Sequence, residues 1–148
     1  MDLLVPLTSG KVTDAGPYFR SRAAAAGDGI IGGTSSGYWV QLVSTGEVRI
    51  RGLNPFGTIA TTGVPGPFNA AVVHTLVSAA QGNRLQVSLD GRVLTSTQNG
   101  SSVNAVTLPA SGANDGAVGI AFGSDDNRGL AGGQRATNLL ITAFSPLQ

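Results

Sequence analysis

The stretch from Tyr38 to Arg51 reads Tyr-Trp-Val-Gln-Leu-Val-Ser-Thr-Gly-Glu-Val-Arg-Ile-Arg, and it decides the fold class. Two runs rich in β-branched and aromatic residues flank Thr45-Gly46, which is the pattern of an antiparallel β-hairpin with a two-residue connection. From Glu47 to Arg51, apolar residues alternate strictly with arginines. Because successive side chains of a strand point to opposite faces, the hairpin is predicted to have one apolar and one polar face.

The polar face of this hairpin is the first candidate for a functional surface. In one strand register, Trp39 and Gln41 lie beside Arg49 and Arg51 on that face. The alternative register turns Tyr38 toward that side instead, and the sequence leaves both registers open. In either case we expect an aromatic ring, an amide and two guanidinium groups to gather on one side of a sheet.

Composition excludes several classes of protein. A chain of 148 residues fits one domain, residues 1–148, with a substantial core. Only 11% of the residues are charged and the net charge is +1, so we expect no nucleic-acid partner, which would need clustered cationic charge. There are no cysteines for disulfides or thiolate sites. The apolar opening Leu3 to Val5 is cut by Pro6 and follows no basic segment, so we expect neither a membrane span nor a signal peptide there.

The rest of the chain alternates short apolar runs with turn residues, including 22 glycines. We expect about ten strands and no helix, which predicts an all-β fold, namely a two-sheet antiparallel β-sandwich or jelly roll. Besides the hairpin, the expected strands are Leu3–Leu7, Val12–Thr13, Tyr18–Ala23, Thr58–Thr61, His74–Ala80, Arg84–Leu89, Arg92–Thr97, Val118–Phe122 and Asn138–Phe144.

The strand that begins at Tyr18 repeats the arrangement of the hairpin. Alternation places Tyr18, Arg20 and Arg22 on one face. If this strand and the hairpin belong to one sheet, four arginines and Gln41 line the same surface.

Two motifs match by chance. Residues Gly27 to Gly32 satisfy G-x-G-x-x-G, and Gly33 to Gly37 satisfy G-x-S-x-G, but neither lies in the strand-to-helix context that the chemistry requires. No strand carries two acids at positions i and i+2, so a glycosidase pair is not expected there. Asp125, Asp126 and Asn127 could supply oxygen ligands to a structural calcium ion, although their spacing does not fit an EF-hand loop. We expect no other cofactor.

Several stretches together resemble a known family. They are Gly16-Pro17-Tyr18-Phe19-Arg20, Gly37 to Leu42, His74 to Gly91, and Val118 to Gly123 followed by Ala136 to Phe144. This order resembles the concanavalin A-like, laminin-G-like β-jelly-roll domains, and it is most similar to bacterial non-catalytic carbohydrate-binding modules, including the fructan-binding type.

The resemblance implies two curved sheets, with sugar bound on the concave sheet or at loops on its rim. It also implies a place beside a catalytic domain in a larger secreted enzyme. The related laminarinases carry E-x-D-x-x-E or E-x-D-x-E, and the jelly-roll alginate lyases carry Q-[IV]-H; this sequence has neither motif. We therefore expect no catalytic residues.

The leading hypothesis is a carbohydrate-binding module, because arginine, amide and carboxylate groups beside a flat ring suit a sugar. Asp125 is a further candidate for contacting a sugar from a loop on the rim of the sheet. The candidate binding residues are Arg20, Arg22, Tyr38, Trp39, Gln41, Arg49, Arg51, Asp126 and Arg128. One alternative is a small glycoside hydrolase or polysaccharide lyase that uses Glu47, His74 and Asp126. Another is a structural or adhesive laminin-G-like domain that contacts protein.

Overall fold

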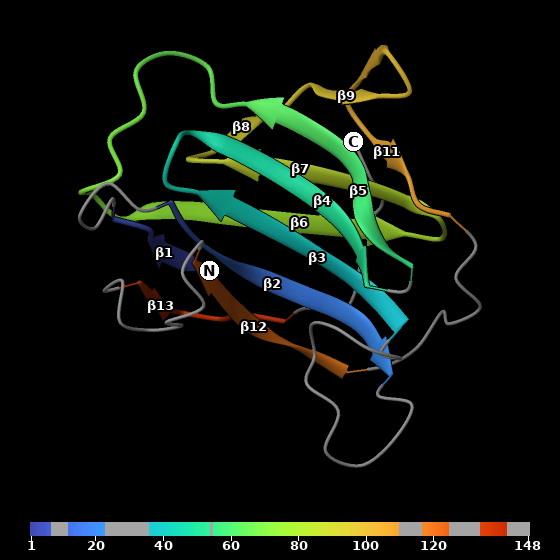
Figure 1. The fold of residues 1–148 in the computed structure, drawn as a ribbon, viewed down its shortest axis with the longest axis horizontal. Helices are drawn as coiled ribbons and strands as arrows, with labels where there is room; N and C mark the ends of the chain where they lie inside the picture. The colour runs from blue at the N-terminus through green and yellow to red at the C-terminus, as the bar shows by residue number, and fades with distance from the viewer. Residues whose placement is uncertain (7–11, 23–35, 54, 110–116, 125–133, 142–148) are drawn as a thin grey trace.

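The fold is a sandwich of two antiparallel sheets (Figure 1). The computed structural model describes residues 1–6, 12–22, 36–53, 55–109, 117–124 and 134–141. Within these ranges all regular structure is β-strand, so the predicted all-β sandwich is confirmed. No helix in the described ranges has the length and hydrophobicity to cross a membrane.

The seven-stranded sheet lies in front in Figure 1. In spatial order its strands are β10 (Ser101–Val103), β9 (Ser96–Gln98), β5 (Phe56–Gly63), β4 (Glu47–Leu53), β3 (Ser36–Val43), β2 (Thr13–Arg22) and β12 (Ala117–Ser124).

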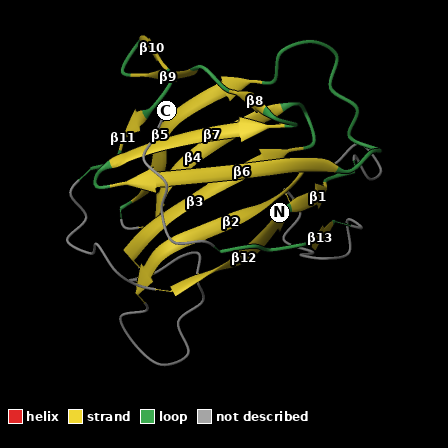
Figure 2. Ribbon diagram, turned by 180° about the vertical axis from the view of Figure 1, so that it is seen from behind, coloured by secondary structure: helices red, strands yellow, loops and turns green. Residues whose placement is uncertain are grey.

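The six-stranded sheet lies in front in Figure 2, where β6 and β7 cross the molecule. Its order is β11 (Val106–Thr107), β7 (Arg84–Leu89), β6 (His74–Gln81), β1 (Asp2–Leu4) and β13 (Arg135–Thr137), and β8 (Arg92–Val93) pairs with β7.

The core fills the space between the two sheets. Val40 and Ile50 of the seven-stranded sheet are fully buried there, as are Leu76 and Leu85 of the six-stranded sheet. These positions follow the period of two that the sequence shows, because only the side chains on one face of each strand can enter the core.

The β3–β4 hairpin adopts the register that places Trp39 opposite Arg51 and Gln41 opposite Arg49. Its connection has three residues, Ser44 to Gly46, so the expected two-residue turn is wrong. The backbone N–H of Ser44 donates to the carbonyl of Thr13 on β2, at 2.8 Å, which removes Ser44 from the β3–β4 pairing. Gly46 then closes the turn at φ 81°, as a three-residue hairpin loop requires.

The expected strand Arg92–Thr97 is divided between the two sheets. Val93 pairs with Ser88 of β7, whereas Thr97 pairs with Thr61 of β5 in the seven-stranded sheet. Leu94, between them, is buried in the core, so the chain crosses from one sheet to the other at this point. The Asp90-Gly91 turn before it joins β7 to β8, as predicted.

The last expected strand, Asn138–Phe144, is also wrong over its described part. The strand is β13, and it ends at Thr137. Asn138 has φ 54°, outside the strand region, and its side-chain amide donates to Asp2 at 2.7 Å. Residues 138–141 are not in a strand, and 142–144 lie outside the described residues.

Candidate functional site

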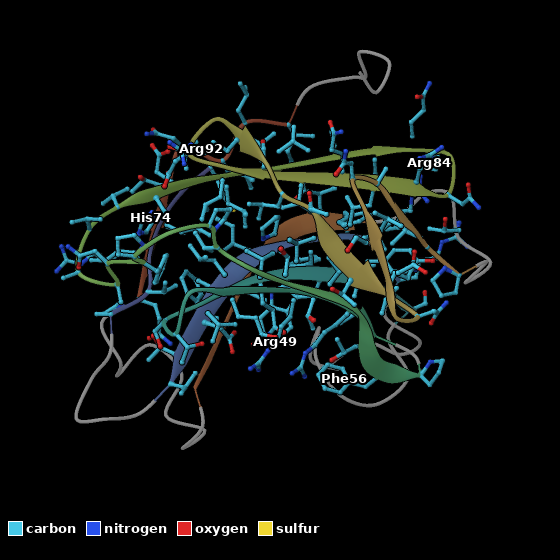
Figure 3. All side chains as sticks on the ribbon, turned by 90° about the horizontal axis from the view of Figure 1, so that it is seen from above. Arg49, Phe56, His74, Arg84 and Arg92 are labelled. Carbon is cyan, nitrogen blue, oxygen red and sulfur yellow. The ribbon has the colours of Figure 1, made fainter. Side chains whose placement is uncertain are left out.

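The candidate site is the outer face of the seven-stranded sheet, meaning the side that points away from the six-stranded sheet. Alternation along β3 and β4 places Trp39, Gln41, Arg49 and Arg51 on this face, because their neighbours in sequence fill the core. Figure 3 shows Arg49 and Phe56 on this side of the lower sheet, and β2 and the end of β5 bend toward the same side.

Cross-strand pairing brings residues of four strands together on this face. Tyr18 of β2 lies opposite Trp39 of β3, which lies opposite Arg51 of β4. One step along, Gln41 lies opposite Arg49, which lies opposite Thr61 of β5. Side chains paired in this way are close enough to contact one another.

The floor of the outer face is buried. Trp39 is 3% exposed and forms a second hydrophobic cluster with Leu53 and Ala121, against which Tyr18 packs. Gln41 is 2% exposed. The tryptophan is therefore neither in the core between the sheets nor a ring open to solvent.

Three polar atoms of this face are buried without a hydrogen-bond partner in the described part of the chain. They are Nε1 of Trp39, Oε1 of Gln41 and Nε of Arg51. A buried polar atom left unpaired costs about 1–3 kcal/mol, so such atoms are rare in folded proteins. The three residues occupy neighbouring positions of this face, in the cross-strand pairs Trp39–Arg51 and Gln41–Arg49.

The accessible rim of this face carries two arginines, and each contacts a different partner. Arg49 donates to Oε2 of Glu47 from Nε at 2.8 Å and from Nη2 at 2.7 Å, and both side chains are 31% exposed. The guanidinium carbon of Arg51 lies 5.0 Å from the ring centroid of Phe56, which is 48% exposed. These contacts orient the two guanidinium groups, and about half of the Phe56 side chain stays exposed beside Arg51.

Tyr38 does not lie on the outer face. Its side chain is buried between the sheets, 5.5 Å from the ring of Phe19 by centroid distance, and its hydroxyl donates to the carbonyl of Pro109. Because the β3–β4 register turns even-numbered residues of β3 inward, Trp39 and not Tyr38 joins the arginines.

Arg20 also leaves the arrangement that alternation predicts. It has φ 52°, and the pairing of β2 with β3 shifts between Phe19 and Arg22, so the period of two breaks here. Nη2 of Arg20 donates to the carbonyl of Gly82 at 2.6 Å, in the turn between β6 and β7 of the other sheet. Arg22 is exposed at the end of β2, opposite Ser36. The expectation that Tyr18, Arg20 and Arg22 share one face is therefore wrong for Arg20.

The predicted loop residues cannot be placed on this face. Asp126 and Arg128, together with the calcium candidates Asp125 and Asn127, lie outside the described residues. Among the residues that are described, no three His, Asp or Glu side chains cluster closely enough to hold a metal ion.

Phe56 is the residue of this face that sequence reasoning missed. It lies between Pro55 and Gly57, which are turn formers, so the expected strand begins only at Thr58, whereas β5 begins at Phe56. A large aromatic residue among turn formers, next to a strand that carries arginines, is the signal that could have identified it.

Comparison with known proteins supports the architecture. The fold is similar to that of a carbohydrate binding module, CBM66, from Bacillus subtilis, with a TM-score of 0.54 and 18% sequence identity. The match covers 84% of this chain and 64% of that protein, so this chain corresponds to less than two thirds of its length. At this identity the likeness concerns the fold alone. No protein-family model and no curated protein sequence matches the chain.

Proposed function

We propose that this chain is a non-catalytic carbohydrate-binding module that holds a poly- or oligosaccharide on the outer face of the seven-stranded sheet. The observation that carries this proposal is the group of buried, unpartnered atoms on Trp39, Gln41 and Arg51. The likeness of the fold to a carbohydrate binding module supports the same function.

The chemistry of the face suits a sugar. Each sugar hydroxyl both donates and accepts hydrogen bonds, so it can accept from Trp39 Nε1 or Arg51 and donate to Gln41 Oε1. Because Trp39 and Gln41 are almost completely buried, a sugar first meets Arg49, Arg51 and Phe56. The side chains that cover the buried atoms have to shift before a hydroxyl or a bridging water reaches them. The exposed ring of Phe56 offers an apolar surface for the face of a sugar ring.

Two of the three candidate catalytic residues, Glu47 and His74, lie in the described part of the chain, and their contacts favour binding over cleavage. Glu47 is held by Arg49 on the outer face. His74, in the six-stranded sheet, is held by Asp90 and by the carbonyl of Asn69. Glycoside hydrolysis needs two carboxyl groups positioned on either side of one bond, and neither of these arrangements supplies that pair.

The proposal includes a place for the module within a larger protein. A binding module brings an attached enzyme close to its polymer, because linkage raises the effective concentration of one near the other. We therefore extend the proposal to a secreted protein in which the module lies beside a catalytic domain, as the sequence resemblance implies.

The test is affinity gel electrophoresis of this chain against fructans, arabinans, xylans and β-glucans. Retardation by at least one polysaccharide is expected, together with no release of reducing ends. Release of reducing ends would replace the proposal with the hydrolase or lyase alternative. Unretarded migration in every gel would reject carbohydrate binding and favour the adhesive alternative.

A further inference from the structure

A concave site lies at one end of the sandwich, away from the outer face. It is a pocket of about 270 Å³ lined by Phe68, His74, Asp90 and Arg92, with prolines and aliphatic side chains completing the wall. Figure 3 shows His74 and Arg92 at the same end of the molecule, whereas Arg84 and Phe56 lie toward the other end. The pocket and the outer-face site are therefore separate.

Three contacts make the wall of this pocket rigid. The rings of Phe68 and His74 stack with centroids 4.5 Å apart and an angle of 20° between their planes. Nδ1 of His74 lies 2.8 Å from Oδ2 of Asp90, and Nε2 lies 2.9 Å from the carbonyl oxygen of Asn69. The shape therefore exists before any ligand arrives, as is usual for small-molecule sites.

The polar groups of the pocket wall differ in how many hydrogen bonds they already make within the protein. Both oxygens of Asp90 are engaged, because Oδ2 meets His74 and Oδ1 accepts from the backbone N–H of Thr75 at 2.8 Å. Both ring nitrogens of His74 are likewise engaged. Arg92 is exposed and forms no ion pair with any residue in the described ranges. Each Asp90 oxygen keeps a second lone pair, but its charge already faces His74, whereas the guanidinium of Arg92 is the charged group of the wall with no partner among the described residues, and it can only donate.

The size of the pocket limits the ligand further. It is slightly below the range of roughly 300–1,000 Å³ that is typical of small-molecule sites. Phe68 and the neighbouring prolines give the wall an apolar part beside the guanidinium group. This combination suits one ring with an apolar face and an attached anion, since arginine pairs with carboxylates through two parallel hydrogen bonds.

We infer that this pocket is a second binding site and that it takes a single sugar ring bearing a carboxylate, that is, a hexuronate. The carboxylate pairs with the guanidinium of Arg92, and the ring lies against the apolar wall. This site does not depend on the outer face, and a chain end or side branch that carries a uronic acid would fit it.

Nuclear magnetic resonance of the isotope-labelled full chain, titrated with sodium D-glucuronate and separately with D-glucose, tests the inference. Glucuronate is expected to shift the backbone amides of residues 68, 74 and 89–94 in a saturable way, and glucose is expected to shift them much less. Shifts of the amides of residues 39–51 would report the outer face instead, so failure of one site is distinguishable from failure of the other. Equal effects of the two sugars, or no saturable shift at the pocket, would overturn the inference.

Arg92→Ala and Arg84→Ala form the matched pair of variants. Both residues are exposed arginines of the six-stranded sheet, on neighbouring strands, so each variant loses the same charge. Arg92→Ala is expected to weaken glucuronate binding at least about tenfold, the usual cost of losing a charge-assisted hydrogen bond, and Arg84→Ala is expected to have no effect. Equal losses in the two variants would overturn the site, because they would show a response to net charge only.

Discussion

Trp39 and Arg51 lie directly opposite each other on β3 and β4, and both side chains are on the outer face. The indole Nε1 of Trp39 and the Nε of Arg51 are both buried, and neither reaches an acceptor among the residues that the structure describes. A ligand oxygen placed between them displaces no existing hydrogen bond of the protein. Under the proposed function, this pair is therefore the place on the outer face where a sugar oxygen would gain most.

Replacement of Arg51 by methionine is expected to weaken retention by polysaccharide at least about tenfold, because the guanidinium donors are lost while the apolar stem is kept. The free energy of unfolding is expected to change by less than about 1 kcal/mol. The substitution removes an unpartnered buried nitrogen, which stabilises, and the contact with Phe56, which destabilises by a similar amount. Affinity gel electrophoresis and urea denaturation measure the two effects.

Arg84→Met is the control for this variant. Arg84 is exposed on β7 of the other sheet, so the same change of charge occurs far from the outer face (Figure 3). The polysaccharide gel is expected to retard Arg84→Met as strongly as the native chain. A matching loss of retention in both variants would contradict a site at Arg51.

Gly16 of β2 lies against the backbone of β3, where a Cβ atom would overlap the carbonyl oxygen of Val40. Gly16→Ala is expected to lower the free energy of unfolding by about 3 kcal/mol or more, because the obstacle is backbone and cannot rotate away. Gly57→Ala is the matched control, since no atom lies within 4 Å of the Cβ that it would add. The control is expected to be neutral or slightly stabilising in chemical denaturation, and equal effects of the two variants would contradict the close approach of β2 to β3.

The sheet faces could be predicted from sequence wherever the alternation was unbroken. From Glu47 to Arg51 a shift of one residue would have buried both arginines in the core, so the apolar set fixes the orientation of β4. The burial of Trp39 could not be predicted in this way. It depends on Leu53 and Ala121, which come from β4 and β12, and no local pattern indicates that they meet.

The two main errors have a common physical origin. At Arg20 a positive φ and a shift of register interrupt the alternation, and at Leu94 the chain passes from one sheet to the other. In both places the sequence still reads as a continuous strand. Pairing with segments distant in sequence decides where each strand ends, and the local alternation of side chains does not indicate that pairing.

The stability of the fold is expected to depend on Asp90 below about pH 4. Partial burial alone would raise the pKa of Asp90, but hydrogen bonds from His74 and the backbone N–H of Thr75 outweigh it and hold the pKa below the ordinary value of 3.8. Because the folded pKa is lower than the unfolded one, this contribution is complete above the unfolded pKa and is lost as the pH falls through the folded pKa.

Thermal unfolding of the native chain and of Asp90→Asn between pH 5 and pH 2.5 measures this dependence. The variant is expected to melt a few degrees lower at pH 5, because asparagine cannot accept from both partners as a carboxylate does. The difference is expected to shrink as the pH falls below the unfolded pKa of Asp90 and toward its lower folded pKa, because the native chain then loses the contribution of the charged carboxylate. Asp2, whose pKa is also lowered, is present in both proteins and accounts for acid loss that they share. A difference that stays constant over this range would contradict the role of the Asp90 charge.

A comparison of Arg20 with Arg51 tests whether an arginine contributes to stability or to the proposed sugar binding. Its guanidinium ties β2 to the turn between β6 and β7 through the carbonyl of Gly82, at 2.6 Å. Arg20→Met is therefore expected to lower the free energy of unfolding by about 1 kcal/mol or less, the usual net contribution of an exposed hydrogen bond, and to leave polysaccharide retention unchanged. The same gels and urea curves then give opposite patterns for the two arginines: retention falls only in Arg51→Met. An arginine that only joins the two sheets can affect sugar binding only by changing the stability of the fold. Loss of retention in Arg20→Met without loss of stability would therefore extend the proposed sugar site to the end of β2.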